Sequence, residues 1–383
     1  MLVNNPLVIY SYTPDRLKEF KSEKKENDII VTALNIIQED GLEELTDDKN
    51  VYVDITNFYK SAQDNPIDVE RIINTVRKKE NLHIIINFNL LTRFKSDFGQ
   101  FIEKIIPIND IYKRGDEVKI DISNLNDDSI KLLKDNLNNK LYGHKKFKGE
   151  LIKQIKNYSI LYNLGELKIM SILICGDSGI GKTELAKIIH NTFYKDSKMI
   201  KINLGNYKTQ GALNSLIGSP KGYFGSERGG ELSNKIQNSD SKVILIDEFE
   251  KADTDIFNFF YELLEDGKFT DLNENEFDLN GYLIIFTSNL NEKNYKDIIP
   301  APLLSRFTMK TLFEPLDYAT KNKYVQEKCK NLVNIYNEKY GKSIDFKDVL
   351  NNIDKDTIKT IKNIRYLNQI VQNTLISYIE NIN

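Results

Sequence analysis

The feature that most constrains the fold of this sequence is a glycine-rich loop within residues 172–183, which read ILICGDSGIGKT. An apolar run of strand length enters the loop, where Gly176 and Gly181 bracket four residues. Lys182 and Thr183 follow directly. In this G-x-x-x-x-G-K-[ST] spacing, backbone N–H groups and the positive end of the next helix bind phosphate oxygens. The spacing therefore predicts a strand, a phosphate loop and a helix within an α/β domain.

The residues after the glycines indicate a nucleotide site. Lys182 can reach the β- and γ-phosphates, and the Thr183 hydroxyl can hold Mg²⁺. A chance glycine loop is the alternative, but strand, loop and helix occur in the order that nucleotide binding requires. The residues expected to contact the nucleotide are Gly176, Asp177, Ser178, Gly179, Ile180, Gly181, Lys182, Thr183 and Glu184.

Composition argues against several other classes of protein. The 383 residues carry a net charge of −3, and no global basic field favours a nucleic-acid partner. Cys175 and Cys329 are too few for a disulfide framework and suit a reducing cytosol. Neither a signal peptide nor an apolar stretch of about 20 residues is visible. We therefore expect a soluble, cytoplasmic protein of two or three domains with no membrane partner.

Residues 1–125 predict a small α/β domain of unknown role that has no phosphate loop. Short apolar segments alternate with two helical segments, 13–25 and 66–80, and the second opens with Pro66 and Asp68. This alternation is typical of α/β domains. The expected strands are 7–10, 28–34, 51–55 and 82–88.

From residue 168 onward, strands and helices alternate in the pattern of a parallel sheet covered on both faces. The expected strands are 169–175, 199–204, 243–246 and 282–287. At the carboxyl end of one strand, Asp247 can hold Mg²⁺ through water and Glu248 can polarise the water that attacks the γ-phosphate. Asn289 follows the next strand, where it could orient that water or form a turn.

The ordered set of motifs resembles the ATPase module of the Clp-type AAA+ chaperones, specifically the second ring of ClpB-like disaggregases. The matching stretches are GKTELAK, MIKINLGNY, LIGSPKGYFGSERGGEL, VILIDEFEKADTDIFNFFYELLEDGKFTD, IIFTSNL, APLLSRF and Asn363-Ile364-Arg365. The resemblance runs from Leu141 to the end of the sequence. It implies an AAA+ P-loop ATPase core at 126–315 and a helical lid at 316–383, with lid helices expected at 318–340, 345–353 and 364–382.

The resemblance implies a role for each matched residue. The residues that would bind and hydrolyse ATP are Lys182, Thr183, Asp247 and Glu248, with Mg²⁺ at Thr183 and Asp247. Asn289 would be the polar sensor. Arg306 would be the arginine finger that reaches the γ-phosphate of a neighbouring subunit, although a surface ion pair is the alternative. Arg365 would be the sensor arginine within the subunit, on a weaker match in which Asn-Ile-Arg-Tyr replaces the family's Gly-Ala-Arg-Pro.

The stretch Gly222-Tyr223-Phe224-Gly225 is similar to the pore loop of the family. Glycines give such a loop mobility, and an aromatic ring can pack on an extended polypeptide without reading its sequence. The resemblance therefore implies that Tyr223 and Phe224 contact a threaded polypeptide. A structural tyrosine turn is the alternative.

The sequence also departs from the family. ClpB-like chains carry two ATPase rings and a long coiled-coil arm, whereas this chain has one intact phosphate loop and no room for the arm. The segment between Asn289 and Arg306 is shorter than usual. No Ile-Gly-Phe or Ile-Gly-Leu loop is present, so we do not expect ClpP to be a partner.

Short matches connect the N-terminal region to the ATPase core. The segment VYVD ends on Asp54, and LLTRF at 90–94 echoes LLSRF at 303–307. A degenerate ATPase-like half that has lost its nucleotide site would have these features. An unrelated α/β module with coincidental matches is the simpler interpretation, and partner or substrate engagement is its expected role.

The sequence as a whole predicts an ATP-hydrolysing protein that remodels or unfolds polypeptide clients by threading them through a homo-oligomeric, hexameric ring. Two other functions remain open. One is a nucleotide-gated assembly switch or scaffold with little threading activity. The other is a DNA-associated AAA+ motor, which the neutral-to-acidic charge disfavours.

Overall fold

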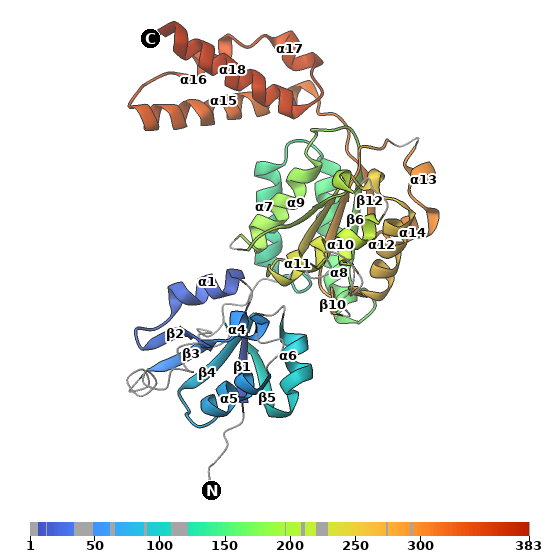
Figure 1. Ribbon diagram of the computed structural model, residues 1–383. Helices are drawn as coiled ribbons and strands as arrows, with labels where there is room; N and C mark the ends of the chain where they lie inside the picture. The colour runs from blue at the N-terminus through green and yellow to red at the C-terminus, as the bar shows by residue number, and fades with distance from the viewer. Residues whose placement is uncertain are drawn as a thin grey trace. The chain divides into compact units, whose positions relative to one another are not determined.

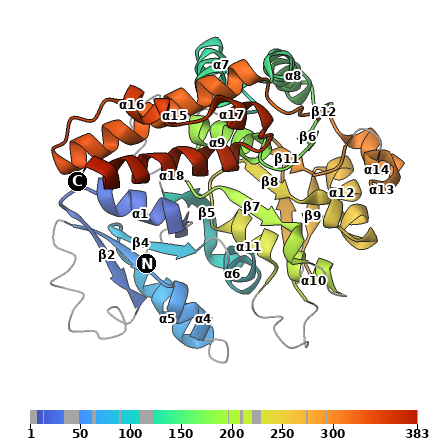
Figure 2. The ribbon, with the colours of Figure 1, turned by 90° about the horizontal axis from the view of Figure 1, so that it is seen from above.

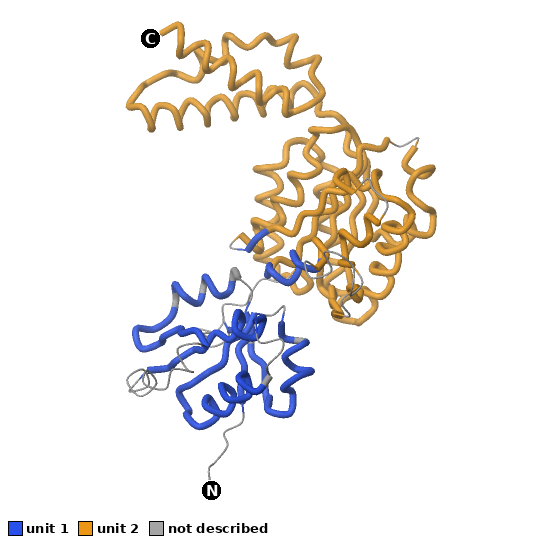
Figure 3. Tube along the Cα trace, in the orientation of Figure 1, with its two compact units in different colours: residues 1–119, 196–198, 233–240 blue, residues 120–195, 199–232, 241–383 orange. Residues whose placement is uncertain are grey.

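The chain folds into two compact units, which the computed structural model describes over most of their length (Figure 3). One unit comprises residues 1–119, 196–198 and 233–240, and the other comprises 120–195, 199–232 and 241–383. The residues described are 7–12, 14–33, 49–61, 66–87, 90–108, 122–195, 197–207, 211–219, 229–272, 275–291 and 294–382. In these ranges no helix is long and apolar enough to cross a membrane.

The N-terminal unit is built on a five-stranded parallel sheet with the strand order β2-β3-β4-β1-β5 (Figure 1). The strands are β1 (Leu7–Tyr12), β2 (Asp28–Thr32), β3 (Asn50–Asp54), β4 (Leu82–Asn87) and β5 (Ile102–Pro107). The first four confirm the strands predicted from their Ile- and Val-rich runs. β5 was not predicted, because IEKIIP mixes charged and apolar residues without a strand period.

Helices of the N-terminal unit bury apolar side chains against this sheet. They are α1 (Pro14–Glu23), α4 (Thr56–Ser61), α5 (Pro66–Val76) and α6 (Leu91–Phe98), followed by the 3₁₀ turn η3 (Gly99–Phe101). In α5, Val69, Ile72, Ile73 and Val76 recur at helical spacing and are all at most 3% exposed. These residues share one hydrophobic cluster with Val53 and the other core residues of the sheet, so the alternation predicted from sequence is confirmed.

The second unit contains another five-stranded parallel sheet, with the strand order β12-β6-β11-β8-β7. Its strands are β6 (Met170–Cys175), β7 (Ile200–Asn203), β8 (Val243–Asp247), β11 (Leu283–Thr287) and β12 (Met309–Leu312). Ile285 of the central strand pairs with Ile172 on one side and Leu245 on the other. The predicted α/β fold with a parallel-sheet core is therefore confirmed.

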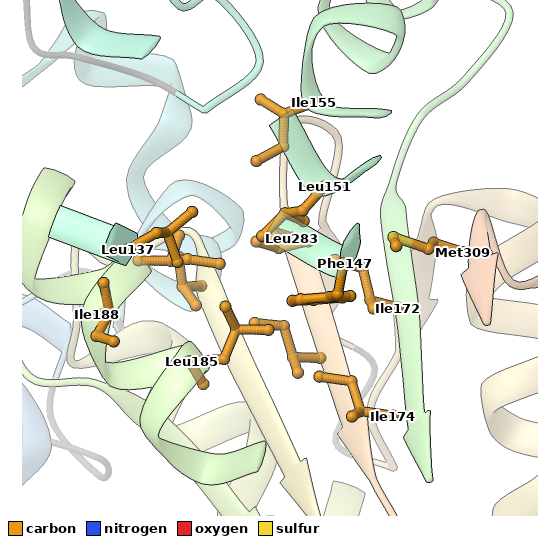
Figure 4. Close-up of a cluster of buried hydrophobic side chains, with 14 of the residues drawn as sticks. Leu137, Phe147, Leu151, Ile155, Ile172, Ile174, Leu185, Ile188, Leu283 and Met309 are labelled. Atoms are coloured by element: carbon orange, nitrogen blue, oxygen red, sulfur yellow. The ribbon is translucent and has the colours of Figure 1, made fainter. Parts of the chain in front are cut away.

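Both faces of this sheet are covered. Figure 4 shows one face, where Leu137, Leu151, Ile155 and Leu185 on α7, α8 and α9 pack with sheet residues such as Ile172. On the other face, Phe286 contacts the rings of Phe249, Phe260 and Phe307 at centroid distances of 4.7–5.1 Å. The helices of this unit before the lid are α7 (Asp127–Lys140), α8 (Lys145–Asn163), α9 (Lys182–Phe193), α10 (Ala212–Ile217), α12 (Thr254–Asp266), α13 (Tyr295–Ile298) and α14 (Ala301–Arg306). The remaining elements of this unit are the 3₁₀ turns η5 (Leu204–Asn206) and η7 (Phe249–Lys251), and the hairpin of β9 (Lys268–Thr270) and β10 (Glu276–Asp278). Most of α11 (Glu231–Gln237) belongs to the first unit.

The C-terminal residues form a small helical bundle, in which α15 lies beside α18 (Figure 2). Its helices are α15 (Tyr318–Tyr340), α16 (Phe346–Asn351), α17 (Lys355–Thr360) and α18 (Ile364–Ile382). Asp317 caps α15 by accepting a 2.7 Å hydrogen bond from the Thr320 N–H, and Gly341 ends it with a positive φ of 63°. The bundle has its own apolar core of Val325, Cys329, Val333, Leu367 and Val371 with their neighbours.

Candidate active site

The phosphate loop connects the end of β6 to the start of α9, as its spacing predicts. Gly176, Gly179 and Gly181 have φ values of 133°, 75° and 106°, which side chains other than glycine rarely adopt. A Cβ on Gly176 would lie only 2.4 Å from the backbone oxygen of Phe313. The loop therefore needs glycine both for its backbone conformation and for space.

Lys182 is the first residue of α9, directly after the loop, and it is 7% exposed. Its Nζ donates hydrogen bonds to the backbone oxygens of Gly176 and Asp177, the latter at 2.8 Å. It also donates to the Oδ1 of Asn289 at 3.1 Å. Burial lowers the pKa of Lys182, while Glu250 and Asp247 act in the opposite direction. A buried ammonium held by neutral oxygens fits a bound phosphate, whose charge would compensate its own.

Asp247 ends β8 and is held by two donors. Its Oδ1 accepts a 2.5 Å hydrogen bond from the Thr287 hydroxyl, and its Oδ2 lies 2.8 Å from the Nζ of Lys201. Burial by itself raises the pKa of Asp247, but the bonds from Lys201 and Thr287 outweigh burial and hold the pKa below its usual value. Asp247 is therefore an ionised carboxylate at the carboxyl end of the sheet.

Glu248 follows Asp247 in a left-handed backbone conformation, with φ at 58°. Only one other described residue that is not glycine, His144, has a positive φ. Such a conformation costs energy and persists where the surrounding structure enforces it. It turns the chain sharply at the end of β8 and directs the Glu248 carboxylate to Gly205, in the turn after β7.

Asn289 connects the phosphate loop to a second acidic group. Its backbone N–H and its Nδ2 donate to the two carboxylate oxygens of Glu250, at 3.2 and 2.9 Å. Its Oδ1 accepts from Lys182. The structure thus brings Lys182, Asn289 and Glu250 together from three segments that are far apart in the sequence.

Arg306, at the last residue of α14, binds to α12 of its own chain. Its Nε lies 2.6 Å from the Oε2 of Glu265, and its guanidinium carbon lies 5.2 Å above the ring of Tyr261. It also donates to the Tyr261 hydroxyl at 3.2 Å. The described partners of the Arg306 side chain therefore lie on α12 and not in the phosphate loop of its own chain.

The start of α18 touches the phosphate loop. The Ile364 N–H donates to the Gly179 backbone oxygen at 2.9 Å, and a Cβ on Gly179 would lie 1.9 Å from the Asn363 side chain. Arg365 follows with an exposed side chain, and its N–H donates to the Asn363 Oδ1. Tyr223 and Phe224 lie outside the described residues.

Comparison with known proteins agrees with this geometry. The sequence model of the AAA domain family (Cdc48 subfamily) matches residues 167–334. The chain is 30% identical to the ClpC subunit of the Clp protease of Staphylococcus saprophyticus over 242 residues, which are 63% of this chain and 28% of ClpC. It is 31% identical to ClpB of Prochlorococcus marinus over 261 residues, which cover 63% of this chain and 29% of ClpB. The region from 167 to 334 is a Clp-type AAA+ domain.

The fold agrees with this assignment. A cryo-EM structure described as the closed state of Hsp104 with ATPγS and FITC-casein matches with a TM-score of 0.56 and 17% identity. The match covers 98% of this chain and 88% of that one. The chain nevertheless spans less than a third of the length of ClpC and ClpB.

His144, directly before α8, lies at the phosphate loop, although no sequence motif indicated a role for it. The Nε2 of His144 donates to the Ile180 backbone oxygen in the phosphate loop at 3.0 Å. Its ring stacks on Phe313 at a centroid distance of 3.9 Å. Burial lowers the pKa of His144, which favours the neutral imidazole. No second His or Cys stands near His144 in the sequence, so no local pattern singled it out.

Gly205 is a second residue that the sequence did not single out, and it supports a testable prediction. A Cβ at this position would lie 2.1 Å from the Glu248 Oε2. Gly205→Ala should therefore displace the Glu248 carboxylate and lower kcat for ATP by roughly 10- to 100-fold, because Glu248 is the expected general base and small displacements of such a group are costly. The carboxylate is flexible, so the melting temperature should change by no more than about 2 °C.

Gly149→Ala is the matched control, because Gly149 lies on α8 with no atom within 4 Å of its missing Cβ. Steady-state ATP turnover and thermal melting of both variants check the prediction. Equal turnover in Gly205→Ala and wild type would show that Gly205 does not set the position of Glu248.

Proposed function

We propose that this chain hydrolyses ATP and uses the energy to remodel polypeptide clients in a homo-oligomeric ring. The observation that carries the hydrolytic part is the buried Lys182 in the phosphate loop beside the ionised Asp247, with Glu248 next in the chain. The cationic lysine is complementary to the phosphates of a nucleoside triphosphate, and the carboxylates are complementary to its metal ion. The kinship with ClpC and ClpB supports the remodelling part.

Each group at the site has a proposed task. Lys182 binds the β- and γ-phosphates, since its ammonium is already oriented by the loop's backbone oxygens. Glu248 polarises the attacking water and accepts its proton. Asn289 orients that water through its amide, which the Glu250 carboxylate fixes in place.

Mg²⁺ fits the donor set at this edge of the sheet. Thr183 supplies a hydroxyl and Asp247 supplies an ionised carboxylate, and both are the hard oxygen ligands that Mg²⁺ prefers. Among the described residues no three His, Cys, Asp or Glu side chains are grouped to hold a metal by themselves. A Mg²⁺ ion here would therefore depend on water and phosphate oxygens, which is its usual environment in nucleotide sites.

Arg306 and the residues Tyr223 and Phe224 support the oligomeric and threading parts of the proposal. The Arg306 side chain binds to α12 and not to its own phosphate loop, so we propose that it contacts the γ-phosphate of a neighbouring subunit. Tyr223 and Phe224 would grip the polypeptide. A hexamer is the proposed assembly, and ClpP is not a proposed partner, since the sequence lacks the docking loop.

ATP turnover per subunit tests this function when it is measured over a range of protein concentrations, with and without casein. We expect turnover to rise with protein concentration, because the proposed finger acts between subunits. We also expect casein to stimulate the wild type but not Tyr223→Ala. Tyr340→Ala, an exposed tyrosine on the lid, is the control.

A different result would favour the nucleotide-gated switch or scaffold. Turnover that is independent of protein concentration and indifferent to casein would support that function. DNA binding with a steep dependence on salt would instead support the DNA-associated motor.

A further inference from the structure

The N-terminal unit repeats the strand order of the Clp-type AAA+ domain. Counted along the sequence, the strands of the N-terminal sheet lie in the order fifth, first, fourth, third, second. The sheet formed by β12, β6, β11, β8 and β7 has the same order. All strands of both sheets are parallel. A shared strand order alone establishes only a shared fold. Side chains at matching positions in the two sheets give further evidence of a relationship.

The third strand of each sheet ends on an aspartate with the same neighbour. β3 ends on Asp54, which pairs with Thr32 at the end of the second strand. β8 ends on Asp247, which pairs with Asn203 at the end of the second strand. Asp54 therefore occupies the position of Asp247, the aspartate that we propose to hold Mg²⁺.

The helix before the fifth strand carries a matching arginine in each unit. Arg93 lies 5.0 Å from the ring of Tyr59, with its Nε 3.6 Å from the Oδ2 of Asp97. Arg306 lies over Tyr261 in the same way, beside Glu265. Both tyrosines come from the helix that follows the third strand.

The phenylalanine after each arginine is buried. Phe94 is 0% exposed and packs edge-on against the ring of Tyr59 at 5.1 Å. Phe307 is 4% exposed and packs on Phe286. The echo between LLTRF and LLSRF is therefore a structural correspondence as well as a sequence match.

The two units differ where the nucleotide would bind. In the Clp-type domain six residues, 176–181, separate β6 from α9. In the N-terminal unit β1 ends at Tyr12 and α1 begins at Pro14, so a single residue intervenes. One residue cannot curl around a phosphate with successive N–H groups.

Side chains fill the corresponding place. The Tyr12 hydroxyl donates to the Asp54 Oδ2 at 2.8 Å and lies 2.8 Å from the Thr56 hydroxyl. The Thr56 hydroxyl accepts from the Asn87 N–H at 2.9 Å, and the Thr56 N–H donates to the Asp54 Oδ1 at 3.0 Å. Tyr12 and Thr56 are 5% and 6% exposed. Bonds within the unit therefore satisfy the polar groups at the ends of the first, third and fourth strands.

We infer that the N-terminal unit is a second AAA+ module whose nucleotide site is closed by the hydrogen-bonded group of Tyr12, Asp54, Thr56 and Asn87. The chain then binds one nucleotide per subunit, at the site around Lys182. The N-terminal unit keeps one conformation at that site throughout the ATPase cycle, and Arg93 acts in packing without contacting a nucleotide. This inference rests on the nucleotide site proposed above.

Nucleotide stoichiometry on the full-length chain tests the inference. Calorimetric titration with ATPγS should give one bound molecule per wild-type chain and none for Lys182→Ala. Thr183→Ala is a second variant in case Lys182→Ala does not fold. Tyr12→Phe should lower the melting temperature because Asp54 and Thr56 lose a partner, but it should leave the stoichiometry at one.

Two results would overturn the inference. One is two bound nucleotides per wild-type chain, and the other is a bound nucleotide that remains in both Lys182→Ala and Thr183→Ala. Arg93→Ala should change ATP turnover by less than about twofold, and a loss comparable to that of Arg306→Ala would also contradict it. Binding of one ATPγS without any turnover of ATP would disprove the proposed function while leaving the closed site intact.

Discussion

Glu248→Gln should lower kcat for ATP hydrolysis by about 10²–10⁴-fold, the usual contribution of a general base. Glutamine keeps the shape of the side chain but cannot accept a proton from water. The affinity for nucleotide should remain within a few-fold of the wild type, because Lys182 and the loop backbone supply the phosphate contacts. Single-turnover hydrolysis and ATPγS binding on the same preparation measure the two effects separately.

Glu262→Gln is the matched control for this experiment. Glu262 lies on the neighbouring helix α12 with an exposed side chain, so the same chemical change should leave kcat within about twofold. If Glu248→Gln behaved like Glu262→Gln, the assignment of Glu248 as the base would be wrong. Slow hydrolysis with wild-type affinity would instead make Glu248→Gln a means of holding the assembly with ATP bound.

Arg306→Ala should lower kcat by ~10³–10⁵, the range found for arginine fingers in related phosphoryl-transfer systems. The guanidinium stabilises charge that develops in the transition state, so its loss affects the chemical step more than binding. Because the Arg306 side chain packs against α12 of its own chain and away from its own phosphate loop, the effect should depend on contact between subunits. Arg93→Ala is the matched control, since Arg93 lies in the similar segment LLTRF and packs over Tyr59 as Arg306 packs over Tyr261.

Mixing two inactive variants tests whether the finger acts between subunits. Arg306→Ala keeps an intact phosphate loop, and Lys182→Ala keeps an intact arginine. A mixed assembly places some intact loops beside intact arginines, so partial turnover should return when the two proteins are combined. No recovery at any mixing ratio, in samples that form mixed oligomers, would indicate that Arg306 acts within its own subunit or only stabilises α12.

Much of the second unit could be predicted from sequence because its signals are local. The spacing of Gly176, Gly181 and Lys182 specifies a loop conformation that few other residues can adopt. The apolar runs VILI before Asp247 and LIIF shortly before Asn289 are long enough to identify buried parallel strands. The three predicted lid helices are likewise present as α15, α16 and α18, while α17 is too short to have shown a clear period.

The order of strands in the sheets could not be read in the same way. Strand pairing joins residues that are far apart in the sequence, such as Tyr12 with Asn87, and no local pattern encodes it. β5 shows the same limit, because its six residues become a strand only by pairing with β1. The shared strand order of the two units therefore became visible only in the structure, although the sequence matches at Asp54 and Arg93 had suggested a relationship.

The sequence by itself determined where a nucleotide can bind, since glycine spacing, a lysine and strand-terminal acids are properties of short segments. Only the tertiary structure decided which groups act on those residues. Gly205 limits the position of Glu248, Lys201 and Thr287 keep Asp247 ionised, and Tyr12 closes the N-terminal site. The physical reason is that hydrogen bonds, burial and steric contact depend on distance in space, which the chain sets only after its strands have paired.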